Sequence, residues 1–121
     1  QYMHTIRFNV VLSGTHDKES IVNLFKENPF IAVTHKNLAN KIFSFGRDHG
    51  YYGRIFNQTV VSIPTVSTLS LGGSTKVTGF CFTPQDGNSL LSSVAAIAYG
   101  LYGKEYKSYM THFKDLLFEE V

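Results

Sequence analysis

The chain opens with a stretch, from Tyr2 to Leu12, in which apolar and polar residues alternate. Side chains of a strand point alternately to its two faces, so His4, Ile6 and Phe8 share one face. The alternation predicts a half-buried strand with His4 on its core-facing side. A turn at residues 13–15 follows this strand.

Apolar residues spaced by three and four then predict two helices. The first covers residues 17–28 and ends before Pro29, because the residue preceding a proline is pushed out of the helical region. A short apolar strand is expected at 30–35. The second helix carries Leu38, Ile42 and Phe45 on one face, with Asn37 as its N-cap. Three glycines at 46, 50 and 53 are expected to end it, with Gly46 as the left-handed cap.

The second half of the chain reads as strands followed by helices. A strand region starts at 55–61 and breaks at Pro64, which cannot donate to a central ladder. Alternating runs at 66–71 and 75–82 flank Gly72 and Gly73, which indicates a hairpin. Helices are expected at 89–101 and 104–120. The order β-α-β-α-β-β-α-α predicts one α+β domain over residues 1–121, with a mostly antiparallel sheet and helices packed on one face.

Composition narrows the class of protein. The 121 residues are 43% hydrophobic and 17% charged, as in a globular domain with its own core. A net charge of +2 is too small to indicate nucleic acid as a partner. The single cysteine, Cys81, excludes an internal disulfide and favours a reducing, cytoplasmic location. No apolar run reaches the roughly 20 residues that a membrane helix needs, so no membrane partner is expected.

Two side chains are candidates for catalysis. Cys81 lies between two phenylalanines in a predicted strand, and we interpret it as a small buried hydrophobe rather than a nucleophile. His4 is either a structural histidine or a general base, the role that histidine fills near neutral pH. The histidines show no metal-ligand spacing, so no metal site is expected.

Three further residues are candidates for binding. Arg47 and Arg54 suit bidentate contacts to a substrate phosphate, and the alternative is that they pair with Asp48 or the helix end. Asn88 either touches a ligand such as a cofactor or caps the following helix. The glycines near Arg47 close a helix rather than open one, so they are not a dinucleotide-binding fingerprint.

The segment Ile42-Phe-Ser-Phe-Gly-Arg-Asp-His-Gly50 resembles the C-terminal catalytic domain of archaeal-type (type II) glyceraldehyde-3-phosphate dehydrogenases, in which a helix ends in a similar turn before a strand. Met3-His4-Thr5-Ile6 is similar to the start of a catalytic-domain strand there. Pro84-Gln85-Asp86 and the apolar segment after it are more loosely similar to the last helix of that family. The resemblance spans the chain from about its start to the helix after Asp86.

The resemblance implies an NAD(P)-dependent aldehyde dehydrogenase in which His4 acts as a catalytic base and the nucleophilic cysteine lies upstream. Gln1 is not a translation start, so the chain is expected to be the C-terminal catalytic or oligomerisation domain of a longer enzyme. NAD or NADP would then bind the full-length protein, with none expected on this chain. The resemblance also implies a homo-oligomer. The alternative is a non-catalytic α+β module that binds a partner protein or a small ligand.

Overall fold

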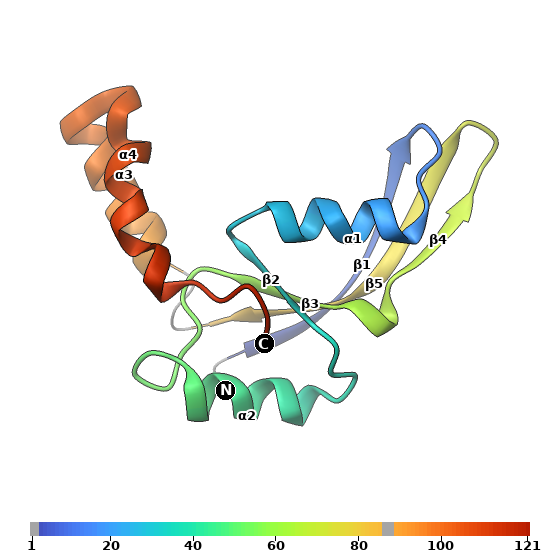
Figure 1. Ribbon diagram of the computed structural model, residues 1–121, viewed down its shortest axis with the longest axis horizontal. Coiled ribbons are helices and arrows are strands. Elements are labelled where there is room, and N and C mark those ends of the chain that lie inside the picture. The colour runs from blue at the N-terminus through green and yellow to red at the C-terminus, as the bar shows by residue number, and fades with distance from the viewer. Residues whose placement is uncertain (1–2, 86–88) are drawn as a thin grey trace.

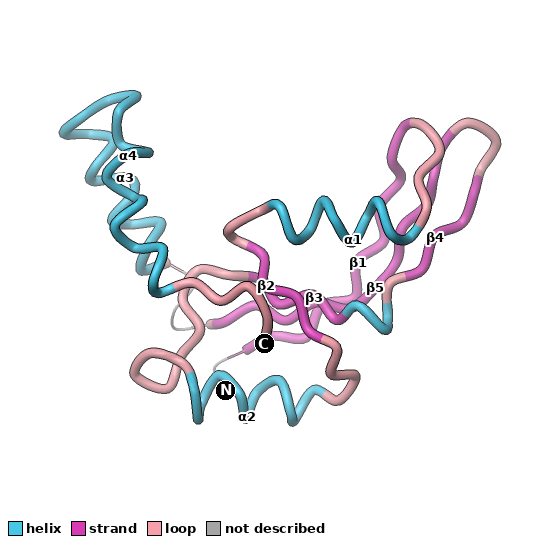
Figure 2. The backbone as a smooth tube through the Cα atoms, in the orientation of Figure 1, coloured by secondary structure: helices cyan, strands magenta, loops and turns pink. Residues whose placement is uncertain are grey.

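The computed structural model describes residues 3–85 and 89–121, and it is an α+β fold built on one five-stranded mixed sheet (Figures 1 and 2). The strands are β1 (Met3–Ser13), β2 (Ile31–Thr34), β3 (Thr59–Ser62), β4 (Ser67–Ser70) and β5 (Ser74–Pro84). The helices are α1 (Lys18–Glu27), α2 (Ala39–His49), α3 (Leu90–Tyr102) and α4 (Tyr106–Met110), with 3₁₀ turns η1 (Ile63–Thr65), η2 (Gly103–Glu105) and η3 (Thr111–Leu116). In the described part of the chain, no helix has the length and apolar character to cross a bilayer.

Strand β5 is a central strand of the sheet and has paired strands on both of its edges. It pairs with β1 along its whole length, from Met3 opposite Pro84 to Ser13 opposite Ser74. Its other edge is shared by β3 and β4, and all of these pairings are antiparallel. Only β2 and β3 run parallel, so the expected mostly antiparallel sheet is confirmed.

Turn chemistry fixes the path between β3, β4 and β5. The turn η1 carries Pro64 and interrupts the strand at one edge of β5, so β3 and β4 follow one another in the same direction along β5. Gly72 and Gly73 have φ values of 65° and 104°, and the Leu71 N–H donates to the Ser74 carbonyl over 2.8 Å. Consecutive positive φ angles are what a tight hairpin turn requires, so the predicted hairpin is confirmed.

The prediction that the helices gather on one face of the sheet is wrong. Adjacent residues of β3 point to opposite faces: Val60 joins a cluster with Ile42 of α2, and Val61 joins a cluster with Ile21 of α1. Figure 1 accordingly shows α1 and α2 on opposite sides of the sheet. Since β3 is apolar at successive positions, both of its faces need cover, and one helix lies on each.

The ends of the first two helices show where local signals succeed and fail. Asp17 caps α1 by accepting the Ser20 N–H over 2.8 Å. Leu38, and not Asn37, is the N-cap of α2, and no side chain caps that end. Helix α2 also runs past Gly46 to His49, so the expectation of a left-handed cap at Gly46 is wrong.

The expected helix at 104–120 breaks into η2, α4 and η3. Gly103 has a φ of 57°, and the hydroxyls of Ser108 and Thr111 donate back to carbonyls three residues earlier, which weakens the α-helical ladder. The chain then returns to the sheet, where Val33 bonds Glu119 and Val121 through backbone groups. Helices α3 and α4 form an arm that projects from the body (Figure 1).

Candidate functional site

His4 lies on the surface, which corrects the expectation of a core-facing side chain. It is exposed, and it pairs with Thr83 in the register of β1 and β5. By strand alternation it shares a face with Ile6 and Phe8, while the buried Met3 points to the opposite face. An exposed imidazole at the end of a strand is accessible to a substrate, as a general base must be.

Cys81 is buried with only 8% of its surface exposed, in the cluster beneath α1. Burial raises the pKa of its thiol, so the neutral form is favoured at neutral pH. Cys81 stands opposite Ile6, which makes His4 a diagonal neighbour on the same face. No hydrogen bond joins these two described side chains, so they do not form a base–nucleophile dyad in this structure. The interpretation of Cys81 as a buried hydrophobe is confirmed.

The two arginines flank the turn that follows α2. Arg47 Nε donates to Asp48 Oδ1 over 2.8 Å and Nη2 donates to Oδ2 over 3.1 Å. This bidentate contact lowers the pKa of Asp48. Arg54 Nη1 donates to the Gly53 carbonyl over 3.1 Å. Arg47 therefore pairs with Asp48, as one of the two alternatives for the arginines predicted. A contact between a substrate phosphate and either arginine stays a prediction.

Gly50 is the glycine that shapes this turn. Its dihedral angles are ordinary (φ −75°, ψ 163°), but a Cβ placed on it would stand 2.3 Å from the carbonyl oxygens of both Gly46 and Arg54. Only a residue without Cβ allows the chain to leave α2 and pass this close to itself. The turn thus combines a close backbone approach at Gly50 with left-handed angles at Tyr52 (φ 52°) and Gly53 (φ 71°).

The predicted site residues do not converge. Arg47 and Arg54 lie at the end of α2, which packs on the face of Met3, whereas His4 points to the other face. Asn88 lies outside the described residues. Among residues 3–85 and 89–121, no group of three or more His, Cys, Asp or Glu side chains could hold a metal ion. These side chains alone do not assemble a catalytic constellation.

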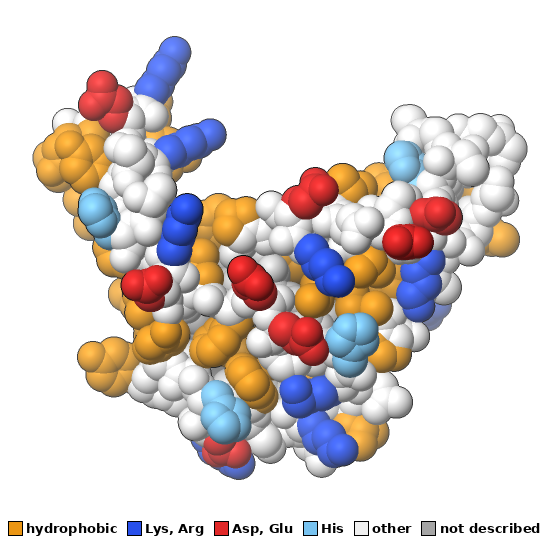
Figure 3. Space-filling model, in the orientation of Figure 1, with side chains coloured by type: hydrophobic (Ala, Val, Ile, Leu, Met, Phe, Trp, Pro, Cys, Tyr) orange, Lys and Arg blue, Asp and Glu red, His pale blue; other side chains and the backbone are white. Residues whose placement is uncertain are grey.

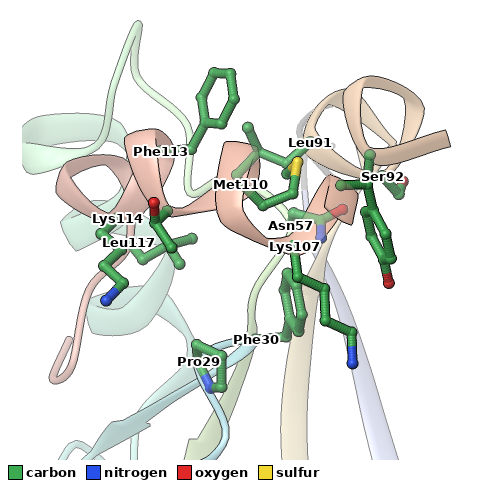
Figure 4. Close-up of a pocket in the computed structure, with 13 residues that line it drawn as sticks. Pro29, Phe30, Asn57, Leu91, Ser92, Lys107, Met110, Phe113, Lys114 and Leu117 are labelled. Carbon is green, nitrogen blue, oxygen red and sulfur yellow. The ribbon is translucent and has the colours of Figure 1, made fainter. Parts of the chain in front are cut away.

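A cavity that the sequence did not predict lies between the C-terminal arm and the body. Its volume is about 580 Å³, within the range of small-molecule sites. Most of the lining is apolar, including Phe30, Leu91 and Met110. Figure 4 shows these side chains converging from α3, α4 and the turn before β2, and Figure 3 shows the surface hollowed between the arm and α1.

Polar groups occur at a few points of the cavity wall. Asn57 takes a left-handed conformation (φ 52°), which asparagine tolerates, and its amide lines the cavity. Lys107 and Lys114 extend their amines toward the side on which Pro29 lies (Figure 4). None of the described lining residues is acidic, so the wall favours an apolar or anionic occupant. The cavity depends on a broken last helix, which the apolar spacing of residues 104–120 did not reveal.

No protein-family model and no curated protein matches the sequence.

Proposed function

We propose that the chain is the sheet domain of a longer NAD(P)-dependent aldehyde dehydrogenase similar to the archaeal-type glyceraldehyde-3-phosphate dehydrogenases. The observation that carries this proposal is the segment 42–50, in which α2 ends at Gly50 and the chain then passes to β3. This is the helix-to-strand unit that the resemblance implies, and it lies on a mostly antiparallel sheet. The fold of that family's catalytic domain is proposed here on the same ground.

In this proposal His4 supplies the base and another part of the enzyme supplies the nucleophile. His4 is exposed on β1, so a cysteine and an aldehyde brought by a preceding domain can reach it. Cys81 is unsuited to that role because its thiol is buried and its pKa is raised. Arg47 and Arg54 are proposed to contact a substrate phosphate, which would require Arg47 to exchange its partner Asp48.

We expect no nucleotide site among the described residues. The glycines with positive φ at 72 and 73 close a hairpin instead of opening a helix beneath a pyrophosphate. We therefore assign NAD(P) to the preceding domain of the proposed enzyme and expect no cofactor on this chain. Isothermal titration of the 121-residue chain with NAD should give no binding heat, and tight binding would show that the domain assignment is wrong.

The test of His4 uses the full-length enzyme. His4→Ala should lower kcat for aldehyde oxidation by about 10²–10⁴-fold, the usual contribution of a general base, with the melting temperature unchanged. His112→Ala is the matched control, since His112 is also exposed and has no proposed role. If His4→Ala keeps full turnover, His4 is an ordinary surface residue and this mechanism fails.

A second candidate function is supported by the cavity. A 580 Å³ cavity with a mainly apolar wall and two lysines suits a non-catalytic module that binds a small apolar anion. Ala95 lines the cavity, while its neighbour Ala96 is exposed outside it. Ala95→Phe should abolish binding of the fluorescent anion 8-anilinonaphthalene-1-sulfonate, and Ala96→Phe should not. Equal binding by both variants would remove the support for this function.

The proposed enzyme is a homo-oligomer. Exposed apolar side chains include Ile97 and Leu101 on α3, which are 64% and 70% exposed, and Val10 and Val11 on β1, which are 45% and 61% exposed. Exposed apolar surface of this kind commonly marks an interface. Each of these places is a candidate for the contact between copies.

A further inference from the structure

Strand β1 has a free edge. In the sheet order its only hydrogen-bonded neighbour is β5, and no described residue donates to or accepts from the outer backbone groups between Thr5 and Val11. The pairing with β5 is continuous over eleven residues and contains no bulge. Such an edge presents a row of unpaired N–H and C=O groups to another strand.

The register shows which backbone groups point outward. Residues paired across an antiparallel ladder alternate between hydrogen-bonded and non-hydrogen-bonded pairs. The Gly14 N–H donates to the Gly73 carbonyl over 3.0 Å, so the even-numbered residues of β1 direct their backbone N–H and C=O groups to β5. Pro84, which has no N–H, stands opposite the odd-numbered Met3, where the ladder requires no donor. The odd-numbered residues Thr5, Arg7, Asn9 and Val11 therefore direct their backbone groups to solvent.

The usual protections of a sheet edge are missing from β1. Natural edges carry prolines, bulges or several charges that prevent pairing with another chain. Residues 3–13 contain no proline, and Arg7 is their only Asp, Glu, Lys or Arg side chain. On the α1 side of the strand, Ile6 and Val10 remain 42% and 45% exposed, although both are apolar.

We propose that two copies of this chain pair through β1, in antiparallel orientation, to form one continuous sheet across a two-fold axis. The inference deepens the homo-oligomer part of the proposed function and selects β1 over α3, because only β1 offers backbone groups as well as apolar side chains. Complete overlap of the strand with itself sets residue n opposite residue 16 − n. Phe8 then faces Phe8 of the second copy at the axis.

This register is chemically self-consistent. The backbone of Arg7 points outward and stands opposite that of Asn9 of the second copy, so the two copies of Arg7 are diagonal neighbours and are not directly opposite each other. Ile6 stands opposite Val10 of the second copy, and each covers apolar surface that the other leaves exposed. Shifting the strands by two residues, to place Arg7 opposite Arg7, would set like charges against each other.

Charge substitution at Asn9 tests the register in the intact protein. Asn9→Arg puts two arginines opposite each other on both sides of the axis, and Asn9→Glu puts a glutamate opposite Arg7 instead. Each cross-strand charge pair occurs twice by symmetry, so the dimer dissociation constants of the two variants should differ about tenfold. Analytical ultracentrifugation measures them, and Arg7→Glu combined with Asn9→Arg should restore dimerisation.

Disulfide trapping gives a second readout. Non-hydrogen-bonded pairs bring Cα atoms to about 4.5 Å, within disulfide range, so the double variant Ile6→Cys/Val10→Cys should form a covalent dimer on oxidation. Each single variant is a matched control and should not, because residue 6 faces residue 10 and not itself. Native Cys81 is replaced by Ala in the double variant and in both single variants, because it stands opposite Ile6 and would otherwise lie within disulfide range of a cysteine at position 6.

Three results would overturn the inference. A monomer at every accessible concentration would remove both this interface and the proposed oligomer. A dimer that Ile97→Asp/Leu101→Asp dissociates, and that responds equally to Asn9→Arg and Asn9→Glu, would place the interface on α3 and leave the oligomer intact. Covalent dimers formed equally by the single cysteine variants would exclude the register.

Discussion

Gln58 and Phe118 bind each other twice, although 60 residues separate them in the sequence. The Gln58 amide donates to the Phe118 carbonyl over 2.7 Å, and its oxygen accepts the Phe118 N–H over 2.8 Å. The same amide also donates to the Pro29 carbonyl over 3.1 Å. One side chain, only 1% exposed, thus joins the loop before β3, the turn before β2 and the segment that follows η3. It holds two walls of the cavity in place.

Replacing Gln58 should therefore destabilise the protein more than its size suggests. Gln58→Leu removes the bonds to Pro29 and Phe118 and leaves part-buried backbone groups without these partners, at up to about 1–3 kcal/mol for each such group. We expect a clear fall in melting temperature and a loss of anilinonaphthalene-sulfonate binding at the cavity. Gln85→Leu is the matched control, because Gln85 is exposed, and it should change stability by less than about 0.5 kcal/mol. Equal melting temperatures for the two variants would contradict the role of Gln58.

The glycine that ends α2 gives the second prediction. Gly50→Ala forces a Cβ to within 2.3 Å of two backbone oxygens, and such overpacking costs about 1–3 kcal/mol or more. Gly100→Ala is the control: nothing lies within 4 Å of its Cβ, and it sits inside α3, so alanine should stabilise the helix by about 0.5–1 kcal/mol. Thermal unfolding should move the two melting temperatures in opposite directions. A neutral Gly50→Ala would mean that the turn relaxes easily.

The third prediction concerns the reactivity of the Cys81 thiol. Because it is buried and its pKa is raised, it should react slowly with a disulfide reagent such as dithionitrobenzoate in the folded protein. The rate should rise sharply in guanidinium, where the thiol is exposed. Fast labelling of the folded protein at neutral pH would instead identify a reactive cysteine and revive a nucleophilic role for it.

Much of the fold follows from local signals. Alternation over residues 2–12 predicted β1, Pro29 marked the end of α1 to within two residues, and Gly72 with Gly73 predicted the hairpin. These signals work because they reflect dihedral preferences and side-chain period, which act within a few residues.

What the sequence missed depends on distant contacts. Helices cover both faces of β3 because Val60 and Val61 pack against different helices. The backbone bond between Val121 and Val33 of β2 likewise joins segments that lie far apart in the chain. The candidate site was missed for the same reason, because its wall combines Phe30, Asn57 and Met110 from three separate segments. His4 was placed on the correct face of β1, but no spacing rule could show that the helices leave it uncovered.

The last prediction concerns pH and the cap of α1. The Asp17 carboxylate accepts the Ser20 N–H, and this bond lowers the pKa of Asp17 below its ordinary 3.8. A group whose pKa is lower in the folded state stabilises that state above its unfolded pKa, and the contribution disappears as pH falls through the folded pKa. Asp17→Ala should therefore lower the melting temperature at pH 7, and the deficit relative to the native protein should shrink as the pH falls below 3.8. Asp17→Asn keeps an accepting oxygen without a titrating charge, so its deficit at pH 7 should be smaller than that of Asp17→Ala, and it too should shrink as the native carboxylate becomes protonated. Parallel melting curves at pH 7 and near pH 2.5 measure both deficits, and an alanine deficit that is the same at the two pH values would show that the carboxylate charge does not stabilise α1.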